Sequence, residues 1–206
     1  MATDWMDLAR YSDTYGYQVD RYRDMSPWRD WVIQAFNENM SYDQFITWQL
    51  AGDLLPKASK EQILATGFNR LHPQNMEDGI VEEEFRVEHV SDRVAVLGEG
   101  LLGLTLSCAK CHDHKYDPIS QKEFYQLIAF FNNIPERGRA IKYGNAAPFI
   151  KAPTKQQQQQ LAELDQKIES YEQMLQEAAP ALKKFQTYWE QQPPASDLQK
   201  PFPEQD

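Results

Sequence analysis

The chain has 206 residues, of which 41% are hydrophobic and 12% aromatic, and its formal net charge is −10. This length suits one domain with an extension, and the apolar content is sufficient for a hydrophobic core. An acidic surface argues against nucleic acid and anionic lipid as partners, since both bind basic side chains. No apolar run reaches the ~20 residues of a membrane span, and the N-terminus does not resemble a signal peptide. We therefore expect either a cytoplasmic protein or a trimmed piece of an exported one.

Helix-start signals divide the first part of the chain into short helices. We expect one helix over residues 5–10. Serine residues at the N-cap position then start three more helices, at Ser26, Ser41 and Ser59. Pro27 supports the first of these three, because proline is favoured at the first helical position. His72 and Pro73 end the last, because a residue before proline is disfavoured in a helix.

Two further helices are expected after a loop over residues 72–80. The first begins at about Glu82, and its apolar residues recur on one face: Val87, Val90, Val94, Leu97 and Leu101. The second starts at Ser120, which forms a capping box with Glu123. This succession of helices predicts an all-α fold for a domain over residues 1–135.

A different kind of segment follows. Residues 136–153 contain several prolines and glycines, and we expect a linker there. Over residues 154–190 apolar side chains recur at alternating steps of three and four: Leu161, Leu164, Ile168, Tyr171, Leu175, Ala178, Leu182, Phe185 and Trp189. This spacing predicts a coiled coil or helical hairpin, kinked or split near Pro180, and its seam over residues 161–189 needs a partner helix. The proline-rich residues 191–206 are expected to form a flexible tail.

Both cysteines of the chain lie in one motif, Cys108-Ala109-Lys110-Cys111-His112. Cys-x-x-Cys-His is the attachment signature of a c-type haem. Two thiols three positions apart on one helical turn can bond to the two vinyl groups of one porphyrin. The adjacent histidine can then bind the iron as its proximal ligand. The sequence therefore predicts that Cys108 and Cys111 attach haem c and that His112 ligates the iron.

Zinc is the main alternative to haem at this motif. Cys108, Cys111 and either His112 or His114 would give three ligands, and the fourth would be His72, His89 or a carboxylate. Zinc sites usually have a second ligand pair a dozen or more residues away, and this sequence has none. A redox dithiol and a pair of buried structural cysteines are further alternatives.

The sixth position of a haem iron decides between two functions. His89, His72 and Met76, in that order, are the candidate sixth ligands for an electron-transfer haem, which is the favoured function. Without a sixth ligand the iron would be open, and a peroxidase-like or other oxidative enzyme would be expected. His114 or His89 would then be the acid–base group. A third hypothesis is a zinc-stabilised or metal-free interaction module that uses the seam over residues 161–189.

Several segments between residues 4 and 135 also occur, in the same order, in a known family. They are Asp7-Leu-Ala-Arg-Tyr-Ser-Asp, Trp28-Arg-Asp-Trp-Val-Ile-x-Ala-Phe-Asn, Gln49-Leu-Ala-Gly-Asp-Leu-Leu-Pro, Ala65-Thr-Gly-Phe, Glu84-Phe-Arg-Val-Glu, Asp92-Arg-Val, Leu102-Gly-Leu-Thr-Leu-x-Cys-Ala-x-Cys-His-Asp-His-Lys-Tyr-Asp-Pro-Ile and Phe124-Tyr-Gln-Leu-x-Ala-Phe-Phe-Asn-Asn. In these segments the chain resembles the planctomycete cytochrome-c-like family, a domain of unknown function in large secreted proteins. Residues 154–190 resemble the helical connector that follows this domain.

The resemblance implies a fragment of a secreted, periplasmic or extracellular, multidomain protein whose signal peptide is not in this chain. It also implies haem at Cys108, Cys111 and His112. A neighbouring cytochrome domain, or another domain of the full-length protein, is the expected electron partner.

Overall fold

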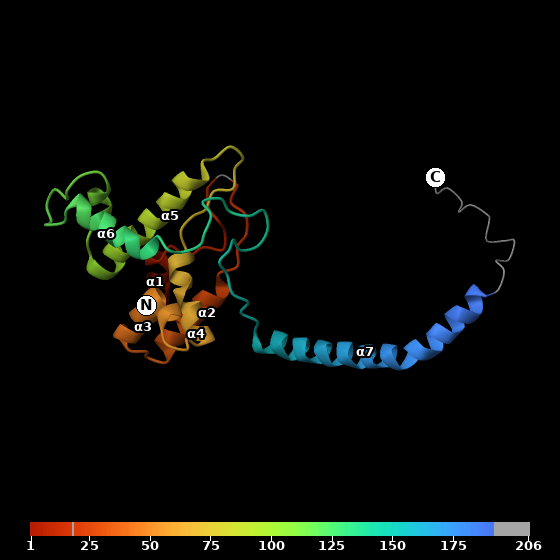
Figure 1. The fold of residues 1–206 in the computed structure, drawn as a ribbon. Helices are drawn as coiled ribbons and strands as arrows, with labels where there is room; N and C mark the ends of the chain where they lie inside the picture. The colour runs from red at the N-terminus through yellow and green to blue at the C-terminus, as the bar shows by residue number, and fades with distance from the viewer. Residues whose placement is uncertain (18, 192–206) are drawn as a thin grey trace. The chain divides into compact units, whose positions relative to one another are not determined.

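The computed structural model describes residues 1–17 and 19–191, and these residues are mostly helical (Figure 1). The described residues form two compact units, one from Met1 to Ala152 and one that begins at Pro153. They contain seven α-helices, and their only β-type pairings are two isolated bridges. The prediction of a mostly helical fold is therefore confirmed. None of the helices in these residues is long and apolar enough to cross a membrane.

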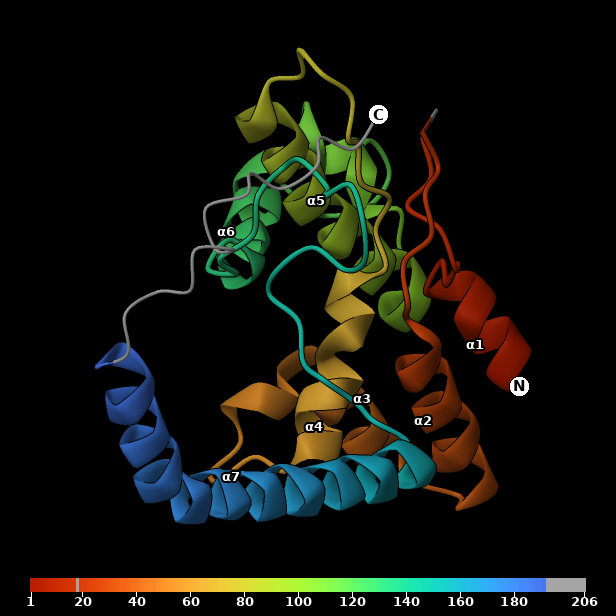
Figure 2. The ribbon, with the colours of Figure 1, turned by 90° about the vertical axis from the view of Figure 1, so that its right-hand side faces the viewer.

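The first four helices of the first unit pack around an aromatic core (Figures 1 and 2). They are α1 (Ala2–Leu8), α2 (Ser26–Asn37), α3 (Tyr42–Ala51) and α4 (Lys60–Ala65), with the 3-10 turns η1 (Gly52–Leu54) and η2 (Thr66–Arg70). Trp31 stacks on Phe45 at 5.5 Å between ring centroids, and Trp28 is 1% exposed. Burial of each such ring stabilises the fold by roughly 1.5–3 kcal/mol.

The second core of this unit lies where α5 (Glu82–Leu97) packs beside α6 (Gln121–Phe131), as both views show (Figures 1 and 2). A π-helical turn η3 (Gly98–Leu102) and a 3-10 turn η4 (Leu106–Lys110) connect the two helices. The buried residues of this core are Val90, Val94, Leu106, Ala109, Phe124 and Phe131. Of the predicted apolar stripe, Val90 and Val94 are buried in this core and Leu97 packs against it. Val87 is instead 39% exposed, and Leu101 lies beyond the end of α5, in η3.

Residues 136–152, where a linker was predicted, pack on the first unit instead. Glu136 and Ala140 are 7% and 6% exposed, and the backbone N–H of Ala140 donates to the carbonyl oxygen of Asn75 at 2.8 Å. Prolines and glycines signal an irregular backbone, but they do not distinguish a free linker from a packed loop. Gly138 allows this packing, because a Cβ atom there would lie 1.7 Å from the carbonyl oxygen of Glu82.

We expect the substitution Gly138→Ala to lower the free energy of unfolding by about 1–3 kcal/mol, because the added methyl group forces the loop away from α5. Urea unfolding followed by tryptophan fluorescence would measure the change. Lys151→Ala, at an exposed position of the same segment, is the control and should leave the unfolding midpoint unchanged. Equal midpoints for the two variants would contradict the close packing of this segment.

The second unit contains one long helix, α7 (Lys155–Glu190). Thr154 and Gln157 form a capping box at its start, and Pro180 lies inside it. Both figures show α7 bending towards its C-terminal end without folding back into a hairpin (Figures 1 and 2). A proline removes one backbone hydrogen bond and bends a helix, but here it does not end it. Residues 192–206, most of the predicted tail, lie outside the described residues.

Candidate functional site

The cysteine motif begins on η4, a turn with one buried and one exposed side, and its residues Cys111 and His112 follow directly after the turn. Side chains three positions apart lie above one another in a 3-10 helix. Leu106 and Ala109 are 5% and 0% exposed and lie in the core between α5 and α6. Cys108 and Cys111 have the same spacing on the other side, where both are exposed free thiols. The turn therefore presents two accessible thiols from a rigid base.

Contacts with both neighbouring helices hold the motif in place. The carbonyl oxygen of Lys110 accepts hydrogen bonds from Nε2 of Gln121 at 3.1 Å and from the hydroxyl of Tyr125 at 3.2 Å, both on α6. The ammonium of Lys110 pairs with Glu88 on α5 at 2.6 Å. The carboxylate of Asp113 accepts from the backbone N–H of Gln121 at 2.7 Å. The positions of the thiols are thus fixed relative to α5 and α6.

His112 is exposed, and its ring is held in one tautomer. Nδ1 lies 2.7 Å from the carbonyl oxygen of Asp113, and this oxygen can only accept. In the neutral ring the proton is therefore on Nδ1, which leaves the lone pair of Nε2 for a ligand. Nε2 makes no hydrogen bond within the described part of the chain. A backbone acceptor at one ring nitrogen and a free lone pair at the other are typical of metal-binding histidines.

His114, the predicted acid–base candidate, is held by hydrogen bonds within the turn that follows the motif. Its side chain is 4% exposed, and Nδ1 accepts the backbone N–H groups of Tyr116 at 3.2 Å and Asp117 at 2.9 Å. Nε2 lies 3.5 Å from the hydroxyl of Thr105. The carboxylate of Asp117 also lies 3.3 Å from Nδ1. His114 therefore fixes the turn that follows the motif.

The motif is not arranged as a zinc site in this structure. Zinc bonds of about 2.0–2.3 Å require all ligand atoms to converge on one point. Within residues 1–17 and 19–191, the one group of three or more such side chains whose ligand atoms lie within 4.8 Å of one another is His72, His89 and Glu136. Neither cysteine belongs to it.

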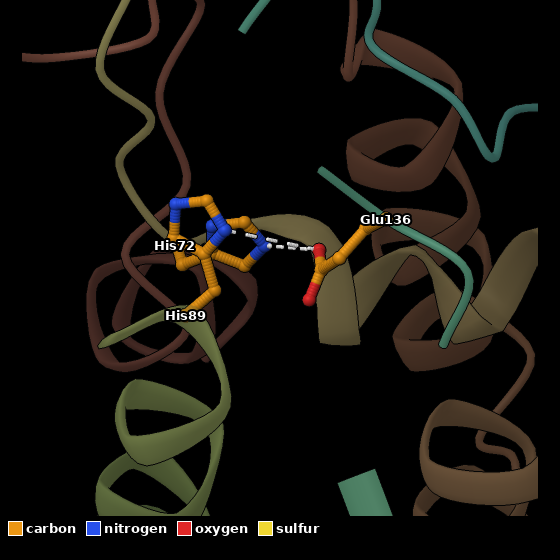
Figure 3. A group of neighbouring side chains, drawn as sticks. All are labelled: His72, His89 and Glu136. Atoms are coloured by element: carbon orange, nitrogen blue, oxygen red, sulfur yellow. Dashed lines mark ion pairs between the residues drawn. The ribbon is translucent and has the colours of Figure 1, made fainter. Parts of the chain in front are cut away.

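His72 and His89, the first candidates for the sixth iron ligand, are brought together in that buried group. Each is 2% exposed, and their rings stack at 4.1 Å between centroids. Nε2 of His72 lies 3.4 Å and Nδ1 of His89 4.0 Å from the same oxygen of Glu136 (Figure 3). Met76, the third candidate, is half-buried in the loop after His72 and does not belong to this group.

Two arginines occupy the polar atoms of this group. Arg93 donates to both oxygens of Glu136, at 2.5 and 2.6 Å, and also donates to Nε2 of His72 at 2.8 Å. Arg70 pairs with the same carboxylate. Two guanidinium cations therefore stand where a metal ion would bind and would repel it. The group is an ionic network that ties together η2, α5 and the segment after α6.

Burial determines the protonation of the network. Desolvation is the main reason that the pKa of His72 is lowered to about 4 and that of His89 to about 3, and the charge of Arg93 contributes to both shifts. Desolvation alone would raise the pKa of Glu136, but its polar contacts with His72 and Arg93 outweigh burial and hold that pKa well below its usual range. At neutral pH the network thus consists of one carboxylate, two guanidinium ions and two neutral rings.

These pKa values predict acid destabilisation. The unfolded chain takes up a proton on each histidine near pH 6.5, whereas the folded chain does so only near pH 4 or below. Stability is therefore fully present above pH 6.5 and falls as the pH falls towards 4, by about 1.4 kcal/mol per pH unit for each proton that only the unfolded chain binds. Both nitrogens of His89 are buried without a hydrogen-bond partner. In His89→Leu the unfolded chain binds one proton fewer, so we expect the free energy of unfolding to fall less steeply with falling pH, by about 1.4 kcal/mol per pH unit.

Urea unfolding at pH 7, 6 and 5 would measure how the free energy of unfolding changes with pH. The variants to compare are His89→Leu and the control His112→Ala, which replaces an exposed ring. The control should retain the slope of the unaltered chain. A slope in His89→Leu as steep as in the control would contradict a neutral buried ring at position 89.

Glu136 and the two arginines that it binds were not predicted from the sequence. Glu136 is 43 residues from Arg93 and 66 from Arg70, and no local pattern relates positions so far apart. The proline before Glu136 signalled only a loop.

Comparison with known proteins gives one match. A model of a protein family described as a protein of unknown function (DUF1549) matches residues 1–136, which is 136 of the 206 residues. The matched region contains the aromatic core, the cysteine motif and the buried network. No curated protein and no solved structure matches the chain.

Proposed function

The chain belongs to this family, PSCyt2, and because the family's function is unknown we propose a role from the motif itself: a c-type haem domain that transfers electrons. One observation carries the proposal. Cys108, Cys111 and His112 are all exposed on or directly after one anchored turn, and the free lone pair of His112 is on Nε2. Paired thiols with an adjacent histidine are the groups that covalent haem attachment requires.

Each residue would have a defined part in holding the haem. The thiol of Cys108 and that of Cys111 would each add across one vinyl double bond, forming a carbon–sulfur bond without net oxidation. Nε2 of His112 would bind the iron, and the carbonyl oxygen of Asp113 would keep the ring oriented. The haem would supply reversible one-electron chemistry at its iron.

The surroundings favour electron transfer over a peroxidase-like reaction. A peroxidase-like site needs an acid–base group with a free lone pair. Nδ1 of His114 accepts two backbone hydrogen bonds, and His89 is buried against His72 and Glu136. For either His89 or His72 to ligate the iron, the ionic network would first have to open. We therefore propose that neither of these two histidines supplies the sixth ligand, which leaves Met76, outside the network, as the candidate for an electron-transfer haem.

The proposed location and partner follow from this chemistry. Covalent haem attachment takes place after export, so we propose a periplasmic or extracellular protein. The electron partner would be a neighbouring cytochrome domain of a longer chain. With a net charge of −10, the chain would associate fastest with a partner that presents a basic face.

A second candidate function, an interaction module, rests on α7. The apolar side chains of its seam are solvent-exposed, from 52% for Leu161 to 69% for Phe185. A seam of this spacing is typical of a helix that pairs with another helix. This role is compatible with a haem in the first unit, and it would be the main function if the motif carries zinc or no ligand.

A haemochrome spectrum tests the proposal. The chain would be exported through a cytochrome c maturation system, denatured to remove loosely bound haem, and examined as the reduced pyridine complex. We expect a c-type band at one haem per chain. No band, together with one zinc per chain by elemental analysis, would overturn the haem proposal in favour of a metal-stabilised interaction protein.

A further inference from the structure

A cavity of about 490 Å³ lies in the first unit, apart from the motif. Residues of α2, α4, η2, the end of α6 and the segment from Asn145 to Ala152 line it, and none of residues 106–117 does. Its apolar lining includes Trp28, Ile63, Phe131 and Ile134. A volume of this size and a mainly apolar lining are typical of small-molecule sites.

Large apolar side chains also surround the cavity where it meets solvent. Leu54, Phe130 and Phe149 line the cavity and are 75%, 76% and 61% exposed. Exposed apolar residues that gather at one cavity, rather than scattering over the surface, indicate a binding site. The cavity and its rim therefore suit a ligand with an apolar body.

Arg23 gives the cavity a buried positive charge. It lines the cavity and is 3% exposed, and its guanidinium donates to the carbonyl oxygens of Leu71 and His72, each at 2.8 Å. No carboxylate lies within 4.0 Å of it among the described residues, and its Nε–H is buried without an acceptor. Backbone carbonyl groups carry only partial charges, so they do not neutralise this cation.

Nearby ionic groups do not supply the missing negative charge. The buried carboxylate of Glu136 is already paired with Arg70 and Arg93, and it makes no ion pair with Arg23. Both histidines beside that carboxylate are neutral at pH 7. Asp24 and Asp53 also line the cavity, but both are exposed and neither pairs with Arg23. Buried positive charge is thus in excess, and a buried charge is stabilised by a paired counter-charge.

We propose that this cavity binds a small amphipathic anion, with an apolar body of one or two rings in the cavity and a carboxylate or sulfonate group paired with Arg23. The anion would accept from the guanidinium, and the apolar rim would cover the ring system. The proposal is independent of haem attachment, because the two sites share no residue.

Two fluorescent probes that differ in one charged group provide the test. The first is 8-anilinonaphthalene-1-sulfonate, and the second is 1-anilinonaphthalene, which has the same rings and no sulfonate. On the unaltered 206-residue chain we expect saturable binding of one sulfonate probe per chain, at least about tenfold tighter than binding of the neutral probe. Equal affinity for the two probes would overturn the proposal, and this comparison needs no variant.

Variants assign the charge to Arg23. Arg23→Gln should lower the affinity for the sulfonate probe by about tenfold or more and leave the affinity for the neutral probe unchanged. Arg29→Gln, which removes the same charge from a position on α2 outside the cavity lining, should change neither. Circular dichroism would confirm that each variant folds. Leu54→Ser, at the exposed rim, should lower the affinity for both probes. Equal affinity for the sulfonate probe in Arg23→Gln and Arg29→Gln would show that Arg23 does not bind the anion and would overturn this part of the proposal. Arg23 would then serve only to bind the carbonyl oxygens after η2.

Discussion

Replacement of both Cys108 and Cys111 by alanine is expected to abolish covalent haem in exported protein. The two thiols are the only cysteines in the sequence, so no other sulfur could form a thioether bond. After denaturation and removal of free haem, the haemochrome band of the double variant should fall to the background level. The fold should persist, because both side chains are exposed and contribute little to the core between α5 and α6.

Single variants and a neighbouring serine sharpen this result. Cys108→Ala or Cys111→Ala would keep one thioether bond and one vinyl group, and the remaining vinyl conjugation should shift the haemochrome band to longer wavelength. Ser107→Ala, on the same turn and also exposed, should attach haem as the unaltered chain does. An undiminished band in the double variant would show that the haem is attached elsewhere.

Loss of the single buried carboxylate should have the largest effect on stability. Glu136→Gln keeps the shape of the side chain but leaves Arg70 and Arg93 buried without a counter-charge, at 15% and 3% side-chain exposure. Removal of one partner from a buried ion pair lowers the free energy of unfolding by about 3–5 kcal/mol. Urea unfolding at pH 7, followed by the fluorescence of the tryptophans in the aromatic core, would measure the change.

Glu82→Gln is the matched control for this prediction. Glu82 pairs with Arg137 at 2.8 Å at the surface, where solvent screens the pair. Its loss should leave the unfolding midpoint within experimental error. If Glu136→Gln were no less stable than Glu82→Gln, the arginines would have to be neutralised by groups other than Glu136.

Local signals in the sequence predicted local structure well. Ser59 and Ser120 were expected at helix N-caps, and both form capping boxes, with Gln62 and Glu123. Glu82 begins α5 as predicted. The two capping boxes depend on hydrogen bonds between residues three positions apart, so a short stretch of sequence contains both partners.

Long-range pairing could not be predicted in the same way. Helical spacing separates His89 from Val90 and Val94 on the surface of α5, but spacing alone does not show which side chain meets His89. The structure shows that His89 meets two side chains. One is His72, in a loop, and the other is Glu136, in a segment predicted to be a linker. Pro180 was expected to kink or split its helix. The helix is not split at Pro180 but bends towards its C-terminal end, because bending can absorb a single lost backbone hydrogen bond.

The position of Glu136 in the chain bears on how the protein folds during synthesis. Arg70 and Arg93 leave the ribosome 66 and 43 residues before the carboxylate that neutralises them. Until then the helices that carry them cannot close without burying two uncompensated cations. Such late, long-range contacts make folding slow and cooperative. We therefore expect the buried ionic network to close only after Glu136 has emerged, when all of residues 1–135 have been synthesised.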